Sequence, residues 1–501
     1  MTESSLIHSK KQVLQAATLD NDQDESLSNP RRSRENRESV KESMIANDKL
    51  QGSFTIIVSI ANAMMGPSVL LLPLQFIDVG LLTSTVVAFI IGLISYRTCD
   101  LTHLHTRLDE IEYLTAIQRI MGTAWNIIYF VNSVVILWMA GIIYFLSLCD
   151  VIYSAIQMAF NVTLPSEESV VFNAFSYQWT GIIIMACIGW LFFLPKLGKI
   201  LDLTEKGVYC IITESLFLLY LGCKAFFSGD GVSFAFYSKD TTQEVAMVTS
   251  VPVTYAIGVF AMAFAIHNSI VAIVRKSSEP SKNSVNVFKA YVLTFVTYIV
   301  TGYFGAIGLY KKSGAGANTV LNNELYDIDE TFTRILLVIT QLATAFQLVT
   351  VLPVINNIVR NQIFIMIWGE AGIPPKGAFW GFNALYIVTF LIVQMFNISP
   401  NTVMSLAGAF IGFVIIYLLP VAIHFKALAQ KQALEKKGYK SISDEGTSEA
   451  SDIAEFLRKK QDINYVLEYG VHGLIMAVGV GIFIMQLVPL IEKLIHWIGS
   501  L

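Results

Sequence analysis

Apolar runs follow one another along most of the chain and are separated by short polar segments. Each run has roughly 20 residues, enough for a helix to cross a hydrocarbon core of about 30 Å. The pattern predicts an all-α membrane protein with eleven transmembrane helices. The predicted spans are Phe54–Leu74, Leu81–Leu101, Ala124–Ile152, Gln178–Leu194, Thr204–Phe226, Met247–Val274, Val285–Tyr310, Phe332–Val354, Gly377–Phe396, Thr402–Phe425 and Tyr465–Ile491.

The composition agrees with a membrane protein. Of the 501 residues, 54% are hydrophobic and 14% are charged, whereas soluble domains carry about 25% charged residues. The net charge of −4 is too small to indicate a nucleic-acid partner. The five cysteines have no paired spacing and no CxxC motif, so we expect neither a disulfide framework nor a zinc site. The sequence predicts no metal site.

Polar residues dominate the first 50 positions, which lack the apolar segment of a signal peptide. We therefore expect a disordered tail at 1–50, followed by an eleven-helix membrane domain at 51–501 with a polar loop at 426–464. Lysine and arginine are concentrated in the loops on the side of this tail, which places the tail and the 426–464 loop in the cytosol. The sequon at Asn161 falls on the opposite side and is a candidate glycosylation site.

Two predicted spans contain helix breakers or polar clusters at membrane depth. The first span places Asn62 shortly before Gly66 and Pro67, and the sixth places His267 and Asn268 together. Such a break is tolerated where it lines a cavity enclosed by protein. The two spans are five helices apart, the spacing of inverted repeats whose first helices are discontinuous near the midplane. The alternative is a plain kink, with the polar side chains hydrogen-bonding between helices.

Other candidates for binding a coupling ion lie in the fifth, sixth and eighth spans. Thr340 and Thr344 share one helix face, and threonine hydroxyls are hard oxygen ligands that suit an alkali cation. Glu214 and His267 are titratable residues within spans and are possible proton sites. The alternatives are that Glu214 faces a polar interior or a helix end, and that His267 is a buried neutral histidine.

Two segments carry a resemblance to a known family. The stretches "ANAMMGPSVLLLP" (Ala61–Pro73) and "FAMAFAIHNSIVAIVRKSSEPSKN" (Phe260–Asn283) are similar to the first and sixth helices of the amino acid/auxin permease family, in the amino acid–polyamine–cation superfamily. The resemblance covers roughly residues 50–495. It is strongest to the lysosomal branch of its sodium-coupled neutral amino acid transporters.

The resemblance implies a LeuT-like core of five plus five helices in an inverted repeat, with one extra helix. It implies that substrate binds between helices 1 and 6 and that Na⁺ or H⁺ is the coupling ion. The family's Gly-x-Gly is here Gly66-Pro67-Ser68, and Pro67 has no N–H for a substrate carboxylate. The substrate-binding candidates are Asn62, Gly66, Ser68, Val69, His267 and Asn268. The ion-binding candidates are Asn62, Thr340 and Thr344.

We therefore predict a secondary active amino acid transporter that works by alternating access and uses no cofactor other than its coupling ion. The alternative is an amino acid sensor that signals to a cytosolic partner through the N-terminal tail. An enzyme is not expected, because the sequence has no P-loop, HExxH or GxSxG motif. The branch resemblance and the sorting-type motif Tyr439–Ile442 favour a lysosomal or vacuolar membrane over the plasma membrane.

Overall fold

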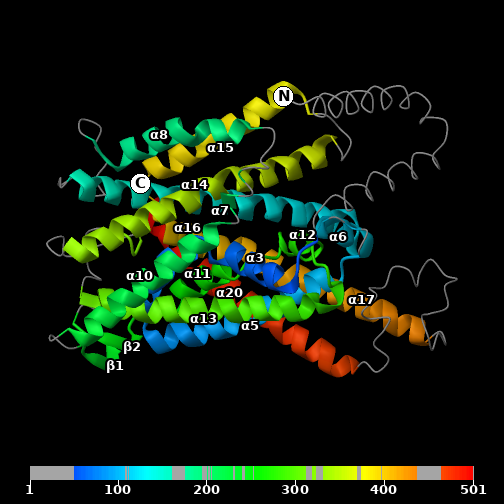
Figure 1. Cartoon of the computed structure of the whole chain (residues 1–501). Coiled ribbons are helices and arrows are strands. Elements are labelled where there is room, and N and C mark those ends of the chain that lie inside the picture. The colour runs from blue at the N-terminus through cyan, green and yellow to red at the C-terminus, as the bar shows by residue number, and fades with distance from the viewer. Residues whose placement is uncertain are drawn as a thin grey trace. The chain divides into compact units, whose positions relative to one another are not determined.

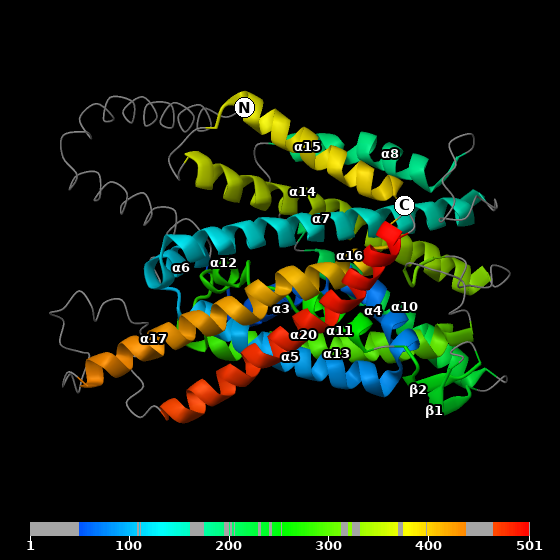
Figure 2. The same ribbon diagram turned by 180° about the vertical axis from the view of Figure 1, so that it is seen from behind.

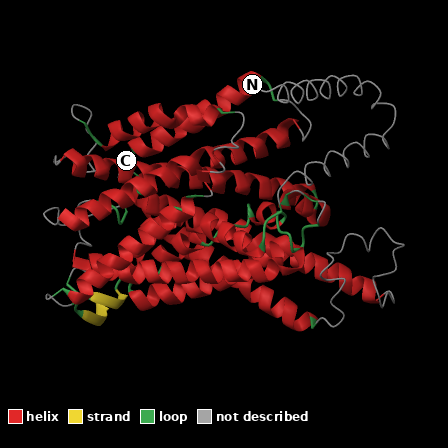
Figure 3. Ribbon diagram, viewed as in Figure 1, coloured by secondary structure: helices red, strands yellow, loops and turns green. Residues whose placement is uncertain are grey.

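The computed structural model is mostly helical, with one pair of short strands at one end (Figures 1 and 3). It describes residues 50–499 except 108–109, 111, 161–174, 195–199, 201–202, 205, 229–231, 240–242, 252, 312–318, 323–330, 369–373, 397 and 437–463. The predicted N-terminal tail and most of the predicted loop at 426–464 therefore lie outside the described residues, as does Asn161.

The chain divides by contacts into two units. One is Met1–Gly52 with Lys276–Ser278, and the other is Ser53–Arg275 with Glu279–Leu501. In the first unit, the Gln51 N–H donates to the carbonyl of Lys276 at 2.7 Å, and the Ser278 N–H donates to the carbonyl of Gln51 at 2.9 Å. The second unit holds every helix described below.

Eight helical segments in the described part of the chain are long and apolar enough to cross a membrane, and a bent pair makes a ninth. The chain is thus a multi-pass membrane protein, while the predicted total of eleven spans is not confirmed. Seven of the eight lie on single α-helices: α5 (Leu81–Leu104), α7 (Thr123–Phe160), α10 (Gly207–Phe227), α13 (Asn283–Leu309), α14 (Thr331–Trp368), α15 (Lys376–Met395) and α20 (Tyr465–Gly499). The span on α13 begins at Pro280, and the span on α20 ends at Leu487. The eighth joins α16 (Pro400–Leu406), two π-helical stretches η5 (Ala407–Ile411) and η6 (Phe413–Leu418), and α17 (Leu419–Lys436).

The other two predicted spans coincide with shorter elements. The fourth is α8 (Tyr177–Ile188) followed by the 3-10 helix η1 (Gly189–Phe193), and the sixth is divided into α11 (Thr254–Ala263) and α12 (Ile270–Val274). The bent pair is α3 (Ser53–Met65) and α4 (Ser68–Val79), which meet at 58°. Two short helices, α6 (Tyr113–Met121) and η2 (Pro280–Lys282), connect longer ones.

The residues of α5 show that a spanning helix has one exposed apolar face and one buried face. Leu82, Val86, Phe89 and Leu93 are spaced by three or four residues and are all exposed, so they form one stripe along the helix. Val87, Ala88, Ile91 and Ser95 are buried on the opposite face. An exposed apolar stripe suits a hydrocarbon environment, and the buried face packs against the other helices.

Helices α7 and α14 pack side by side, as do α10 and α13. The pair α8 and α15 lies outside α7 and α14 in both views (Figures 1 and 2). The broken helices α3–α4 and α11–α12 lie in the middle of the bundle. At about 1.5 Å per residue, the 38 residues of α7 and of α14 reach well beyond the hydrocarbon core.

One predicted boundary is wrong. The sixth span was expected to start at Met247, but β2 (Val245–Thr249) forms there and pairs in parallel with β1 (Phe234–Ser238), in the register Phe234 to Val245 and Ser238 to Thr249. Two valines and a threonine favour extended backbone. The Thr249 hydroxyl also donates to the carbonyl of Asp78 at 2.6 Å, which ties the strand to the end of α4.

Candidate functional site

The predicted break in the first span is confirmed. Helix α3 ends at Met65, and α4 begins at Ser68 with Pro67 as its N-cap. Gly66 has a φ of +24°, a conformation that disfavours a side chain. A Cβ at Gly66 would also overlap the hydroxyl of Tyr144. At the start of α4 the Leu70 N–H donates to the carbonyl of Pro67 at 3.1 Å. The preceding N–H groups, of Ser68 and Val69, belong to the first helical turn, which makes the break a favourable place for an anion.

The sixth span is broken over a longer stretch. Helix α11 ends at Ala263, residues 264–269 are not helical, and α12 begins at Ile270. His267 and Asn268, which the sequence singled out, lie within this stretch. The non-helical backbone therefore falls where the sequence shows a polar cluster without a proline.

A single tyrosine links the two breaks. The hydroxyl of Tyr298, on α13, lies 2.9 Å from the carbonyl oxygen of Met64 and 2.9 Å from that of Ala263. These carbonyls belong to the last turns of α3 and α11, where no helical N–H donor follows for them. One hydroxyl proton is shared between two acceptors, so each carbonyl keeps capacity for a further donor.

A cavity of about 250 Å³ lies at the two breaks. Ligand sites for drug-sized molecules have about 300–1,000 Å³, so this cavity suits a smaller ligand. Apolar side chains of α7 and α14, such as Ile136 and Val351, form much of its wall. The polar side chains of the lining are those of Asn62, Ser68, Tyr144, Thr204, His267, Asn268, Ser269 and Gln347.

The predicted substrate residues are mostly brought together here. Asn62, Ser68, His267 and Asn268 line the cavity. Gly66 and Val69 are buried beside these residues in the first helix but are not part of the lining. The predicted ion residues Thr340 and Thr344, and the predicted proton residue Glu214, also lie outside the lining.

His267 is held by the second predicted span. Its Nε2 lies 2.9 Å from the hydroxyl of Thr98, on α5, and that hydroxyl donates to the carbonyl of Ile94 at 3.0 Å. The Thr98 proton is thus used within its own helix, so His267 donates from Nε2 and carries a lone pair on Nδ1. Nδ1 is buried and has no partner among the described residues, as is also true of Oδ1 of Asn62.

A second cavity of about 320 Å³ shares Asn268 and Ser269 with the first. It extends along α12 to Glu112 and Gln362, on the side where α6 lies. The Tyr129 hydroxyl donates to Oδ1 of Asn268 at 3.3 Å. This contact lies at a residue that lines both cavities.

Glu214 and Thr344 meet away from the cavity lining. The Thr344 hydroxyl, on α14, donates to Oε1 of Glu214, on α10. Glu214 is 2% exposed, and its Oε2 has no hydrogen-bond partner among the described residues. Thr340 lies one turn earlier, and its hydroxyl donates to the carbonyl of Leu336 at 2.8 Å. A carboxylate and a hydroxyl supply hard oxygen atoms of the kind that a proton or an alkali cation neutralises.

Sequence reasoning missed Tyr298 and Tyr144. Tyrosines within apolar runs are typical of membrane proteins, and many lie near span ends as interfacial residues. Nothing in the local sequence shows that the hydroxyls of these two point at the breaks. A tyrosine well inside a span, where its hydroxyl needs a buried partner, is the one signal that was present.

The comparisons with known proteins agree with this geometry. A family model described as a transmembrane amino acid transporter protein matches residues 51–443. The chain belongs to this family. Its members transport amino acids across membranes, so the family also excludes the enzyme reading, in line with the sequence prediction.

Individual relatives are distant. The chain is 21% identical over 434 residues to the sodium-coupled neutral amino acid transporter 9 homolog of Caenorhabditis elegans, covering 75% of this chain and 68% of that protein. It is 24% identical over 183 residues to neutral amino acid transporter 9 of Danio rerio, covering 35% of this chain and 32% of that one. The resemblance to the amino acid/auxin permease family is confirmed.

A solved structure shows the same fold. The crystal structure of MhsT in complex with L-phenylalanine superposes with a TM-score of 0.56 at 11% identity, covering 88% of this chain and all of that one. The predicted LeuT-like helical fold is thus confirmed.

Proposed function

We propose that this family member is a secondary active transporter that moves α-amino acids by alternating access through the cavity at the two helix breaks. The observation that carries the proposal is the chemistry of the two ends of that cavity. The start of α4, where Ser68 lines the cavity, suits a carboxylate. Oδ1 of Asn62 and Nδ1 of His267 suit the donors of an ammonium group.

The apolar part of the cavity supports a substrate with an uncharged side chain. Ile136, Ile143, Val351 and Ile355 form part of the cavity wall. The worm relative's name refers to neutral amino acids, which agrees with such a wall.

We further propose that Glu214 and Thr344 form the coupling site, with Asn62 and Thr340 as further candidate ligands. A buried carboxylate without a compensating charge costs several kcal/mol, at least about 3. Its hydrogen bond from Thr344 supplies no charge. A proton or a sodium ion at Glu214 would supply the compensating positive charge. Binding of that ion would then favour one state of the transporter.

The cytosolic N-terminus and the lysosomal or vacuolar location belong to the same proposal. They are supported by the distribution of lysine and arginine, by the resemblance to the lysosomal branch, and by the motif Tyr439–Ile442. Colocalisation of the tagged chain with lysosomal or vacuolar markers tests the location, and residence at the plasma membrane would contradict it.

The test of function is uptake by the purified chain in liposomes. Labelled amino acids should accumulate when a Na⁺ gradient or a pH gradient is imposed, with each gradient varied separately. One gradient should drive accumulation above equilibrium, and dissipating it should release the label. Specific binding of amino acids without any uptake would instead favour the sensor.

A further inference from the structure

Histidines gather where α5 ends, near the start of α20 and in the first part of α17. Of the seven histidines in the chain, four lie here: His103, His105, His424 and His472. They come from three helices far apart in sequence, and Figure 2 shows α17 and α20 side by side near α5. None of these four histidines lines the cavity.

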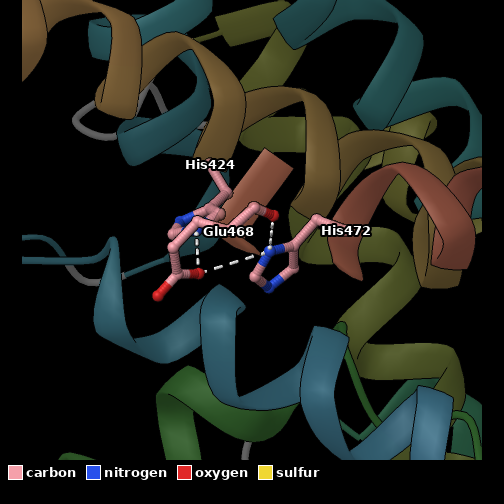
Figure 4. Close-up of side chains that lie close together, drawn as sticks. All are labelled: His424, Glu468 and His472. Atoms are coloured by element: carbon pink, nitrogen blue, oxygen red, sulfur yellow. Dashed lines mark hydrogen bonds and ion pairs between the residues drawn. The ribbon is translucent and has the colours of Figure 1, made fainter. Parts of the chain in front are cut away.

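Three side chains in this group have the arrangement of metal ligands. Glu468 and His472 are one turn apart on α20, and His424 faces them from α17 (Figure 4). Oε2 of Glu468 lies 3.3 Å from Nε2 of His424 and 3.4 Å from Nδ1 of His472. One ligand atom from each residue lies within 4.8 Å of the others.

These distances match zinc geometry. Zn²⁺ binds histidine nitrogen and carboxylate oxygen at about 2.0–2.2 Å in a tetrahedron, which places neighbouring ligand atoms about 3.3–3.5 Å apart. Both histidine side chains are 1% exposed, and that of Glu468 is 17% exposed. The ligands are thus largely desolvated, with access from the side of Glu468.

The surroundings favour a bound cation in one respect and oppose it in another. Nδ1 of His424 lies 3.1 Å from Nε2 of His105, so a hydrogen bond on its other ring nitrogen orients His424, which is a general feature of histidine zinc ligands. Against this, Arg97 donates to Nε2 of His472 at 3.2 Å, and its guanidinium lies 3.8 Å from Glu468. Arg97 also pairs with Asp100 at 3.3 Å, which gives it a partner when it moves aside.

We propose that His424, Glu468 and His472 form a zinc site that joins α17 to α20. Nδ1 of His472 lies 2.7 Å from the backbone carbonyl of Glu468 and donates to it while Arg97 occupies Nε2. Zinc binding requires that Arg97 leave Nε2 and that the ring proton move there from Nδ1. His424 then binds through Nε2, Glu468 through Oε2 and His472 through Nδ1, and water completes the tetrahedron. The cysteine spacing predicted no metal site. The ligands here are instead two histidines and a glutamate. Glu468 and His472 are four residues apart, but His424 lies 44 residues before Glu468, so the sequence shows no zinc motif. The site is independent of the transport proposal.

Direct metal analysis tests the site. The full chain, purified with a tag that lacks histidine and stripped with a chelator, should bind one Zn²⁺ after dialysis. Co²⁺ in its place should give the visible absorption of four-coordinate cobalt. His472→Ala and Glu468→Gln should each weaken Zn²⁺ binding by more than about 100-fold, which exceeds the loss expected from a supporting residue. His103→Ala is the matched control and should bind Zn²⁺ as the unmodified chain does.

Two further variants separate ligation from a structural role. Arg97→Gln should tighten Zn²⁺ binding by about tenfold or more, because it removes a positive charge beside the ligands. His472→Cys should retain Co²⁺ and add a thiolate-to-cobalt charge-transfer band, since cysteine sulfur also binds this class of metal. The proposal is overturned if the unmodified chain takes up no Zn²⁺, or if Glu468→Gln and His472→Ala retain full affinity.

Discussion

The Thr344 hydroxyl donates a hydrogen bond to Oε1 of Glu214, which joins α14 to α10 inside the membrane domain. The sequence marked Thr344 as a candidate sodium ligand and Glu214 as a candidate proton site, and the structure places the two in contact. The proposed coupling chemistry thus involves one site shared by both residues.

Replacing the carboxylate should separate coupling from translocation. An amide at position 214 is neutral at every pH, so Glu214→Gln needs no compensating cation. We expect this variant to exchange labelled for unlabelled amino acid but not to accumulate it above equilibrium. Wild-type accumulation by Glu214→Gln, measured in proteoliposomes, would contradict the assignment.

Thr344→Val should weaken the same site without removing the charge. A hydrogen bond to a charged group contributes about 1.5–3 kcal/mol, so the apparent affinity for the coupling ion should fall by about tenfold or more. Thr350→Val is the comparison, because the Thr350 hydroxyl, on the same helix, donates to the carbonyl of Gln347 in its own helix at 2.9 Å. Equal effects of the two variants on the ion dependence of uptake would show that the contact with Glu214 has no special role.

Gly66→Ala should disrupt the break in the first helix for two reasons. The positive φ is strained for alanine by roughly 1–2 kcal/mol, and its Cβ would overlap the Tyr144 hydroxyl. We expect a lower unfolding temperature and little uptake, with partial recovery when Tyr144→Phe is added. Gly122→Ala is the control, because Gly122 has a φ of +93° with nothing within 4 Å of a Cβ. Normal uptake by Gly66→Ala would contradict this account.

Tyr298→Phe should loosen the link between the two breaks. The carbonyls of Met64 and Ala263 would lose their shared donor, at a cost of about 1–3 kcal/mol. We expect weaker substrate binding and a lower unfolding temperature. Tyr303→Phe removes a hydroxyl of the same helix that bonds Thr85 instead. If substrate affinity in binding assays were no weaker in Tyr298→Phe than in Tyr303→Phe, the link would have no part in the site.

Thr98→Val should lower the affinity for substrate, because Thr98 fixes the proton of His267. Without the Thr98 hydroxyl, Nε2 loses its acceptor and the proton is no longer fixed there, so Nδ1 is less available to an ammonium group. We expect substrate affinity to fall by up to about tenfold, the equivalent of one hydrogen bond. Thr85→Val, on the same helix, should leave affinity unchanged. An unchanged affinity in Thr98→Val would refute the role of His267 as an acceptor.

The sequence predicted the parts of this architecture that depend on local chemistry. Runs of apolar residues identified the spans, and Gly66 with Pro67 identified the break in the first helix, because both residues weaken helical hydrogen bonding. The break in the sixth helix was less plain, since His267 and Asn268 carry no backbone restriction. The predicted start of the sixth span at Met247 was wrong, because a short run of apolar and β-branched residues can form either a strand or a helix.

The rest depends on helices that are distant in sequence. Whether Glu214 faces Thr344, and whether Tyr298 reaches both breaks, is set by how α10, α13 and α14 pack. No local pattern contains that information. The same is true of His424 and Glu468, which are 44 residues apart.

The most direct test of the account is whether bulk in the cavity stops transport. Ala140 lines the cavity from α7, and Val135 is exposed on the outer face of the same helix. In proteoliposomes with an imposed ion gradient, Ala140→Phe should fold but fail to accumulate labelled amino acid, while Val135→Phe should accumulate it like the unmodified chain. Accumulation by Ala140→Phe at the unmodified rate would show that the substrate does not pass through this cavity.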